Sequence, residues 1–133
     1  MRVSEIMETR VRATVPDAII ADAITTIADA HVSGLPVVDN QGRLVGVIST
    51  SDILSAIAES EDADARERFF GSTQVQEIMS RQPMTIEPDA TLKDAAERLL
   101  YLDVHRLFVV EEGKLVGVVS QTDIARTVAT SRR

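Results

Sequence analysis

Serine and aspartate stand three positions apart at two places in the chain, as Ser49 with Asp52 and as Ser120 with Asp123. In both places a short apolar run ends at the serine, and an amphipathic helical pattern begins near the aspartate. A carboxylate accepts hydrogen bonds from two neighbouring hydroxyl groups, as a ribose requires. The spacing therefore predicts a polar corner suited to a sugar, beside the free N–H groups of a helix N-terminus.

Helix capping is the alternative explanation for the same spacing. A serine or an aspartate at a helix start satisfies free N–H groups and opposes the helix dipole without any ligand. In this interpretation Ser51 or Asp52 caps the first of these helices. Thr122 or Asp123 caps the second. The residues at each corner are compatible with both roles.

An internal repeat contains both corners and covers nearly the whole chain. Residues 3–7 return as 75–79, a shift of 72 (75 − 3), and residues 42–53 return as 113–124, a shift of 71 (113 − 42). One residue has therefore been lost in a turn between these two blocks. Such self-similarity predicts two copies of one folding unit, which pack together because each alone buries only a modest core.

Within each copy the hydrophobic pattern predicts an extended leading segment, a helix, a hairpin and a second helix. A stripe with helical spacing predicts the first helix, and paired apolar runs predict the hairpin; the helices are 20–28 and 92–100, and the strands are 35–38 with 44–48 and 107–110 with 115–119. The predicted boundaries are a first repeat at 1–60, a linker at 61–72 and a second repeat at 73–133. The charged linker is expected to be a solvated helical extension whose Phe69 and Phe70 dock on the module.

Composition excludes several classes of function. The chain has 133 residues, 44% hydrophobic and 26% charged, which is typical of a folded soluble protein. A net charge of -7 argues against nucleic acid as the main partner, and the lack of cysteine excludes disulfides and thiolate metal sites. Residues 1–8 lack the apolar segment of a signal peptide and no stretch is long enough to span a membrane, so a cytoplasmic protein without membrane contact is expected.

The succession 35–39, LPVVD, followed by 42–52, GRLVGVISTSD, and its second copy strongly resembles the cystathionine β-synthase (CBS) domain pair, or Bateman module. The resemblance spans residues 1–128. It implies an α+β fold of two β-α-β-β-α repeats related by pseudo-twofold symmetry. It also implies two clefts that bind AMP, ADP, ATP or S-adenosylmethionine, and association into a homodimer.

The resemblance also assigns roles to individual residues. Asp52 and Asp123 are expected to bind the ribose, with Ser49 and Ser120 beside the sugar or phosphate. Backbone groups are expected to line the adenine pocket at four further positions, which are Thr14, Val15, Thr85 and Ile86.

His105 and Arg106 resemble the pair with which the γ subunit of AMP-activated kinase contacts phosphates. The first copy has Ser33 and Gly34 at these positions, so unequal sites are expected, with phosphate recognition nearer Asp123. A strand-edge histidine beside a solvated arginine is the alternative explanation of this pair.

No catalytic motif is present: the sequence has no P-loop, no GxSxG, no HExxH and no Gly-rich dinucleotide fingerprint. The expected function is a regulatory module, not an enzyme, that requires no cofactor, binds an adenosine compound and acts on an unknown partner protein. The alternative is a structural dimerisation module with empty clefts.

Overall fold

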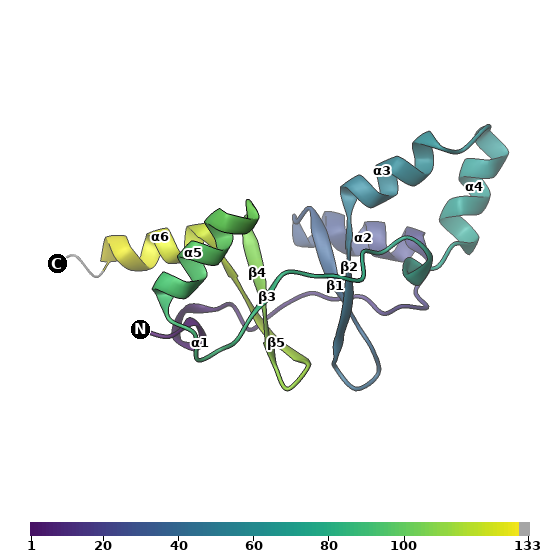
Figure 1. Cartoon of the computed structure of the whole chain (residues 1–133). Helices are drawn as coiled ribbons and strands as arrows, with labels where there is room; N and C mark the ends of the chain where they lie inside the picture. The colour runs from purple at the N-terminus through teal and green to yellow at the C-terminus, as the bar shows by residue number, and fades with distance from the viewer. Residues whose placement is uncertain (131–133) are drawn as a thin grey trace. The chain divides into compact units, whose positions relative to one another are not determined.

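The computed structural model describes residues 1–130, which form parts of two compact units (Figure 1). The first unit comprises Arg12–Pro83. The second unit comprises Met1–Val11 together with the chain from Met84 onward. Residues 131–133, the end of the predicted second repeat, lie outside the described residues.

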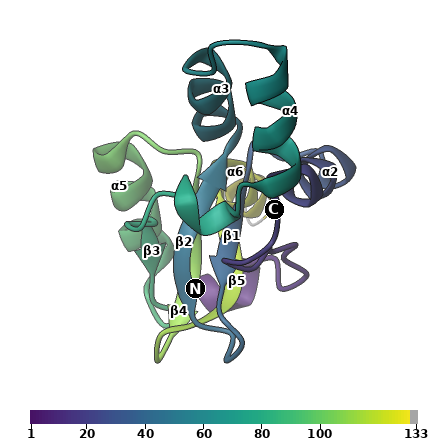
Figure 2. The same cartoon turned by 90° about the vertical axis from the view of Figure 1, so that its right-hand side faces the viewer.

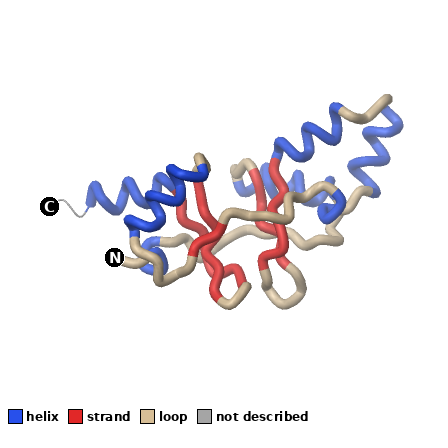
Figure 3. Tube along the Cα trace, viewed as in Figure 1, coloured by secondary structure: helices blue, strands red, loops and turns tan. Residues whose placement is uncertain are grey.

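The first unit is built around an antiparallel hairpin with helices packed beside it. Its elements are α2 (Ile20–Ala30), β1 (Gly34–Val38), β2 (Leu44–Ser49), α3 (Thr50–Ala58), α4 (Ala63–Ser72) and the 3-10 turn η1 (Val75–Glu77). The leading segment joins the hairpin at one bridge, where Thr14 pairs in parallel with Val37. The hairpin strands are drawn in red in Figure 3.

The second unit repeats this plan with a three-stranded sheet in the order β3-β4-β5. Its elements are α1 (Val3–Ile6), β3 (Thr85–Ile86), α5 (Leu92–Leu102), β4 (Arg106–Glu111), β5 (Lys114–Ser120) and α6 (Gln121–Thr130). Strand β3 runs parallel to β4, and β4 runs antiparallel to β5. Both predicted hairpins and both first helices are therefore present, each within two residues of its expected ends.

Aliphatic side chains fill both cores, as the low aromatic content requires. In the first unit Ile20, Leu35 and Ile48 are almost fully buried, and in the second unit Ile86 and Leu107 are. Burial of one such side chain contributes about 1.5 to 3 kcal/mol of hydrophobic free energy. The helical stripes predicted from the sequence contribute to these cores except at their last positions, Ala28 and Leu100, which are exposed.

The predicted linker at 61–72 is largely helical. Helix α4 starts after Asp62, whose carboxylate accepts a hydrogen bond from the Ala65 N–H at 2.7 Å. Phe69 and Phe70 meet edge to face, with ring centroids 5.4 Å apart, and pack against the core of the first unit. Figure 2 shows α4 following α3 after a short turn. The expectation that the two phenylalanines dock on the module is thus met.

The compact units are offset from the sequence repeats. Segment 75–79, which begins the second copy, places Val75 and Met79 in the core of the first unit, while Val3 lies in the core of the second. Backbone hydrogen bonds fix each segment: Ser80 bonds with Val47 at 2.9 Å in both directions, and Glu8 bonds with Val118 at 2.8 and 2.9 Å. The predicted boundaries follow the sequence repeat. In the structure, by contrast, the leading segment of each copy packs in the unit that the rest of the other copy forms.

Among residues 1–130, no helix combines the length and the apolar character needed to cross a bilayer.

Candidate functional site

The first corner lies where β2 gives way to α3. The Ser49 hydroxyl oxygen accepts a hydrogen bond from the Asp52 N–H at 3.1 Å, and Asp52 Oδ2 accepts one from the Ser49 N–H at 2.9 Å. This reciprocal pair is a capping box. The capping residue is Ser49 and not Ser51 or Asp52, because the strand ends one residue before the helix begins and Ser49 has extended backbone angles at that junction.

The second corner reproduces this geometry where β5 gives way to α6. The Ser120 hydroxyl oxygen accepts from the Asp123 N–H at 3.1 Å, and Asp123 Oδ2 accepts from the Ser120 N–H at 2.9 Å. Here too the serine, and not Thr122 or Asp123, has the capping position. Capping thus occurs at both corners, as one of the two interpretations of the sequence predicted.

The backbone carbonyls at positions 33 and 105 bind the first residue of the helix at each corner. The Thr50 N–H donates to the Ser33 carbonyl at 2.9 Å, and in the second unit the Gln121 N–H donates to the His105 carbonyl at the same distance. Strand pairing brings the next residues to the serines, with Gly34 opposite Ser49 in the first unit.

Arg106 lies opposite Ser120 at the second corner. The structure therefore brings the predicted pair, His105 and Arg106, to the same corner as Ser120 and Asp123. The Arg106 guanidinium carbon lies 5.2 Å from the centre of the Phe108 ring. Burial lowers the pKa of Arg106, although an arginine keeps its charge at any physiological pH. His105 is exposed.

Thr14 and Val15 lie beside the first hairpin. The Thr14 N–H donates to the Pro36 carbonyl at 3.0 Å, and the Thr14 carbonyl accepts from the Val38 N–H at 2.9 Å. Both backbone groups of Thr14 are thus used in strand pairing. The Thr14 side chain is buried, whereas the Val15 side chain is exposed to solvent.

Thr85 and Ile86 form strand β3 of the second unit. Ile86 is buried and pairs with Val109 as Thr14 pairs with Val37, so Ile86, and not Thr85, is the structural equivalent of Thr14. The Thr85 carbonyl accepts a hydrogen bond from Arg98 Nη1 at 2.9 Å. The predicted pair Thr85 and Ile86 therefore lies one residue earlier in its repeat than the pair Thr14 and Val15.

Comparison with known protein families also divides this chain into two copies of one unit. The profile of the CBS domain matches this chain twice, at residues 3–59 and 75–130. The chain belongs to the CBS domain family. The tandem CBS pair and the α+β fold of two repeats, both predicted from the sequence, are confirmed.

Two relatives and two solved structures illustrate the similarity to other CBS proteins. The CBS domain-containing protein YhcV of Bacillus subtilis is 32% identical over 92% of this chain and 82% of its own length. Chloroplastic CBSX2 of Arabidopsis thaliana is 29% identical over 89% of this chain, which spans 58% of that protein. The chain spans about half the length of the first relatives that it matches.

Both solved structures contain adenosine compounds. The crystal structure of CBSX2 in complex with AMP has a TM-score of 0.82 at 28% identity and covers 99% of this chain and 98% of that one. The CBS domain pair of protein MJ0100, in complex with 5′-methylthioadenosine and S-adenosyl-L-methionine, has a TM-score of 0.75 at 25% identity, with coverage of 99% and 98%. CBS pairs are in general regulatory modules rather than enzymes.

Arg126 is a charged neighbour of this CBS pair's second corner that sequence reasoning missed. Its Nη1 lies 3.6 Å from Asp123 Oδ1, and the two side chains are 69% and 22% exposed. The first copy has Ser55 at the matching position (126 − 71). The signal was available in the repeat alignment, because a residue three positions after an aspartate on a helix lies on the same face.

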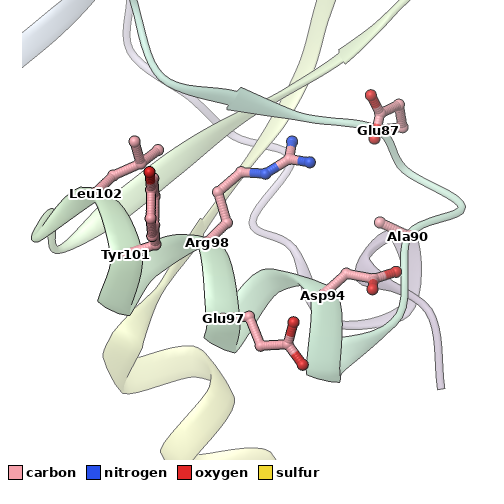
Figure 4. Close-up of a pocket in the computed structure, with 7 residues that line it drawn as sticks. All are labelled: Glu87, Ala90, Asp94, Glu97, Arg98, Tyr101 and Leu102. Carbon is pink, nitrogen blue, oxygen red and sulfur yellow. The ribbon is translucent and has the colours of Figure 1, made fainter.

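A separate hollow of ≈ 600 Å³ lies beside α5 in the second unit and includes none of the predicted site residues. It is lined by Glu87, Ala90, Asp94, Glu97, Arg98, Tyr101 and Leu102. Figure 4 shows Arg98 reaching from α5 toward β3, where it bonds the Thr85 carbonyl. Arg98 thereby satisfies a carbonyl at the edge of the sheet.

Three further positively charged or titratable residues lie on the surface. Arg10 and Arg12 are exposed and belong to different units, and His31 is the exposed left-handed residue that ends α2. Within the part of the chain that the structure describes, no group of three histidine, aspartate or glutamate side chains is arranged to hold a metal ion.

Proposed function

We propose that this CBS pair is a regulatory module that binds adenosine-containing ligands at its two serine–aspartate corners. The proposal rests on the observation that the two oxygens of each aspartate carboxylate have different roles. Oδ2 accepts the serine N–H of the capping box, and among residues 1–130 Asp52 Oδ1 accepts no hydrogen bond. Asp123 Oδ1 lies in the loose ion pair with Arg126.

Capping and ligand binding are compatible because they use different carboxylate oxygens. The capping box holds the aspartate in one rotamer, so little side-chain entropy is lost when a ligand binds. The outer oxygen then accepts hydrogen bonds from the ribose hydroxyls, and charge-assisted bonds of this kind are about twice as strong as neutral ones. The complexes of CBSX2 with AMP and of MJ0100 with S-adenosyl-L-methionine support this ligand class.

The proposed ligands are AMP, ADP, ATP or S-adenosylmethionine, and no permanently bound cofactor is required. The module performs no reaction of its own. Ligand binding shifts the populations of two arrangements of the repeats, and the change acts on a separate regulated protein. Ser49 and Ser120 contact the sugar or phosphate in this proposal, while the exposed Val15 and the strand β3 border the adenine.

Calorimetric titration of the whole chain with AMP, adenosine and S-adenosylmethionine tests the proposal. Asp52→Ala and Asp123→Ala each remove the proposed ribose acceptor of one corner, so each is expected to weaken binding at that corner roughly tenfold or more. Asp123→Ala is expected to have the larger effect on AMP, because His105 and Arg106 accompany only the second corner.

Asp94→Ala is the matched control. Asp94 occupies the same place in the capping box of α5, where it accepts the Thr91 N–H at 3.1 Å, but it lies at neither corner. Loss of a cap alone would therefore lower stability and leave affinity unchanged in this variant. If no adenosine compound binds below millimolar concentration while circular dichroism shows an intact fold, the module is a structural dimerisation unit with empty clefts.

A homodimer is part of the same proposal. Exposed apolar side chains on α3 and α5 support it: Leu54 borders an apolar groove of ≈ 400 Å³ between α2 and α3, and Leu100 and Tyr101 are 79% and 89% exposed. Light scattering on the purified chain gives the oligomeric state directly, and a monomer at micromolar concentration would contradict this part.

A further inference from the structure

The two corners have the same hydrogen bonds but different charges. Asp123 is accompanied by Arg126 on α6 and by Arg106 on the facing strand. At the matching positions of the first unit Asp52 is accompanied by Ser55 and Gly34, neither of which is charged. Both corners have a helix N-terminus and an identical capping box, so these shared features cannot distinguish one ligand from another.

Arg126 can readily exchange its partner. An N···O distance of 3.6 Å is longer than the 2.7 to 2.9 Å of a close charge-assisted bond, and the arginine is 69% exposed. An ion pair with so exposed a partner contributes little to the stability of a fold. A ligand phosphate therefore competes easily with the Asp123 carboxylate for this guanidinium.

Chemistry indicates what Arg126 would contact. The 5′-phosphate of a nucleotide is attached to the same sugar whose hydroxyls the aspartate binds. A guanidinium that already reaches the aspartate is therefore within a side-chain rotation of that phosphate, and guanidinium and phosphate form paired hydrogen bonds. In the first corner a phosphate would meet Asp52 with no cation among Ser55, Gly34 and Ser33, so like-charge repulsion would oppose it.

We propose that Arg126 is the residue that selects a 5′-phosphate at the second corner, and that the first corner takes an adenosine compound whose 5′ group is uncharged or cationic. The inference rests on the proposed function, because it divides one ligand class between the two corners. It assigns the nucleotide to Asp123 and a phosphate-free nucleoside, such as a thioether or a sulfonium, to Asp52.

The test isolates each corner by removing the aspartate of the other. In an Asp52→Ala background, Arg126→Ser converts the second corner to the residue found in the first. The dissociation constant of AMP is expected to rise about tenfold, and that of adenosine less than about twofold. In an Asp123→Ala background, Ser55→Arg makes the reverse change, and the first corner is expected to gain affinity for AMP over adenosine by a similar factor.

Lys93→Ser is the matched control for charge. Lys93 forms an exposed helical ion pair with Glu97 at 3.8 Å in the same unit, so its loss removes the same charge away from the corner. The inference is overturned if Arg126→Ser and Lys93→Ser change AMP affinity equally, or if Arg126→Ser weakens AMP and adenosine alike. If the unmodified chain binds no adenosine compound, the proposed function itself has failed, which is a different result.

Discussion

The two units share the backbone contacts that hold each corner and differ in the charged side chains beside it. In both, a glycine of the last strand lies against a methionine, a capping box ends that strand, and a leading segment is held by a pair of backbone bonds. Among the differences are Arg126 against Ser55, Arg106 against Gly34 and two distinct hairpin turns. Duplication has thus preserved what the backbone needs, and it has left ligand charge and turn chemistry free to change.

The largest effect is expected at the duplicated glycines, where the match between the units is close but incomplete. A Cβ on Gly46 would lie 2.6 Å from the Ser80 carbonyl oxygen, which the Val47 N–H holds in place. A Cβ on Gly117 would first meet the flexible Met7 side chain, at 2.6 Å, with the Glu8 carbonyl at 3.0 Å. Gly46→Ala should therefore cost about 3 kcal/mol and Gly117→Ala about 1 kcal/mol in chemical unfolding.

Gly71→Ala is the control for this pair, since a Cβ there meets nothing within 4 Å. Gly71 lies inside α4, so alanine should leave stability unchanged or raise it slightly. Equal losses of stability in Gly46→Ala and Gly117→Ala would contradict this difference. They would show that the segments facing the two glycines move aside equally well for a Cβ.

The repeat and its periodicity made most of each unit predictable, because hairpin and helix depend on neighbours in sequence. The exchange of leading segments was not predictable. Val3 and Val75 have similar neighbours in sequence, so the local sequence does not indicate which unit's core each residue enters. The choice is made by long-range bonds such as Glu8 with Val118.

At the corners, sequence reasoning found the serines and aspartates but not the division of labour between carboxylate oxygens. Thr85 and Thr14 are not equivalent residues, because the shift of 72 holds up to the hairpin turn and makes Ile86 the equivalent of Thr14 (86 − 14), in agreement with the strand pairing. Arg126 has no charged counterpart in the first copy, where Ser55 stands at the matching position, so the features that the two copies share do not point to it.

A smaller effect is expected at the second hairpin, whose turn differs from the first. Glu112 and Gly113 have φ of 53° and 83°, which is the left-handed geometry of a two-residue type I′ turn. Glutamate tolerates this region poorly and asparagine tolerates it well. Glu112→Asn should therefore raise the free energy of unfolding by roughly 0.5 to 1 kcal/mol.

Glu111→Asn provides the comparison for this variant, because it removes the same charge from a residue paired in β4 opposite Lys114. A gain confined to Glu112→Asn identifies backbone strain as the cause. A similar gain in both variants would instead point to relief of repulsion in a chain of net charge -7.

The smallest effect is expected in acid at the first hairpin, whose turn depends on a carboxylate. Asp39 Oδ1 accepts the Arg43 N–H at 3.0 Å and the Gln41 N–H at 2.9 Å. These bonds, that from Arg43 first, lower the pKa of Asp39 below its usual 3.8. A lowered carboxyl pKa stabilises the fold above the unfolded-state value, and that contribution is lost as pH falls through the folded-state value.

NMR titration of the Asp39 carboxyl, followed at the Gln41 and Arg43 amides, should therefore give a midpoint below 3.8. The Asp39→Asn variant retains an acceptor oxygen in the turn but has no carboxyl to titrate, so its amide shifts should stay constant into acid. A midpoint at or above 3.8 would mean that the carboxylate does not hold the turn. The two hairpins would then differ only in the length and backbone angles of their turns, and the chemical comparison between the units would rest on the charges at their corners.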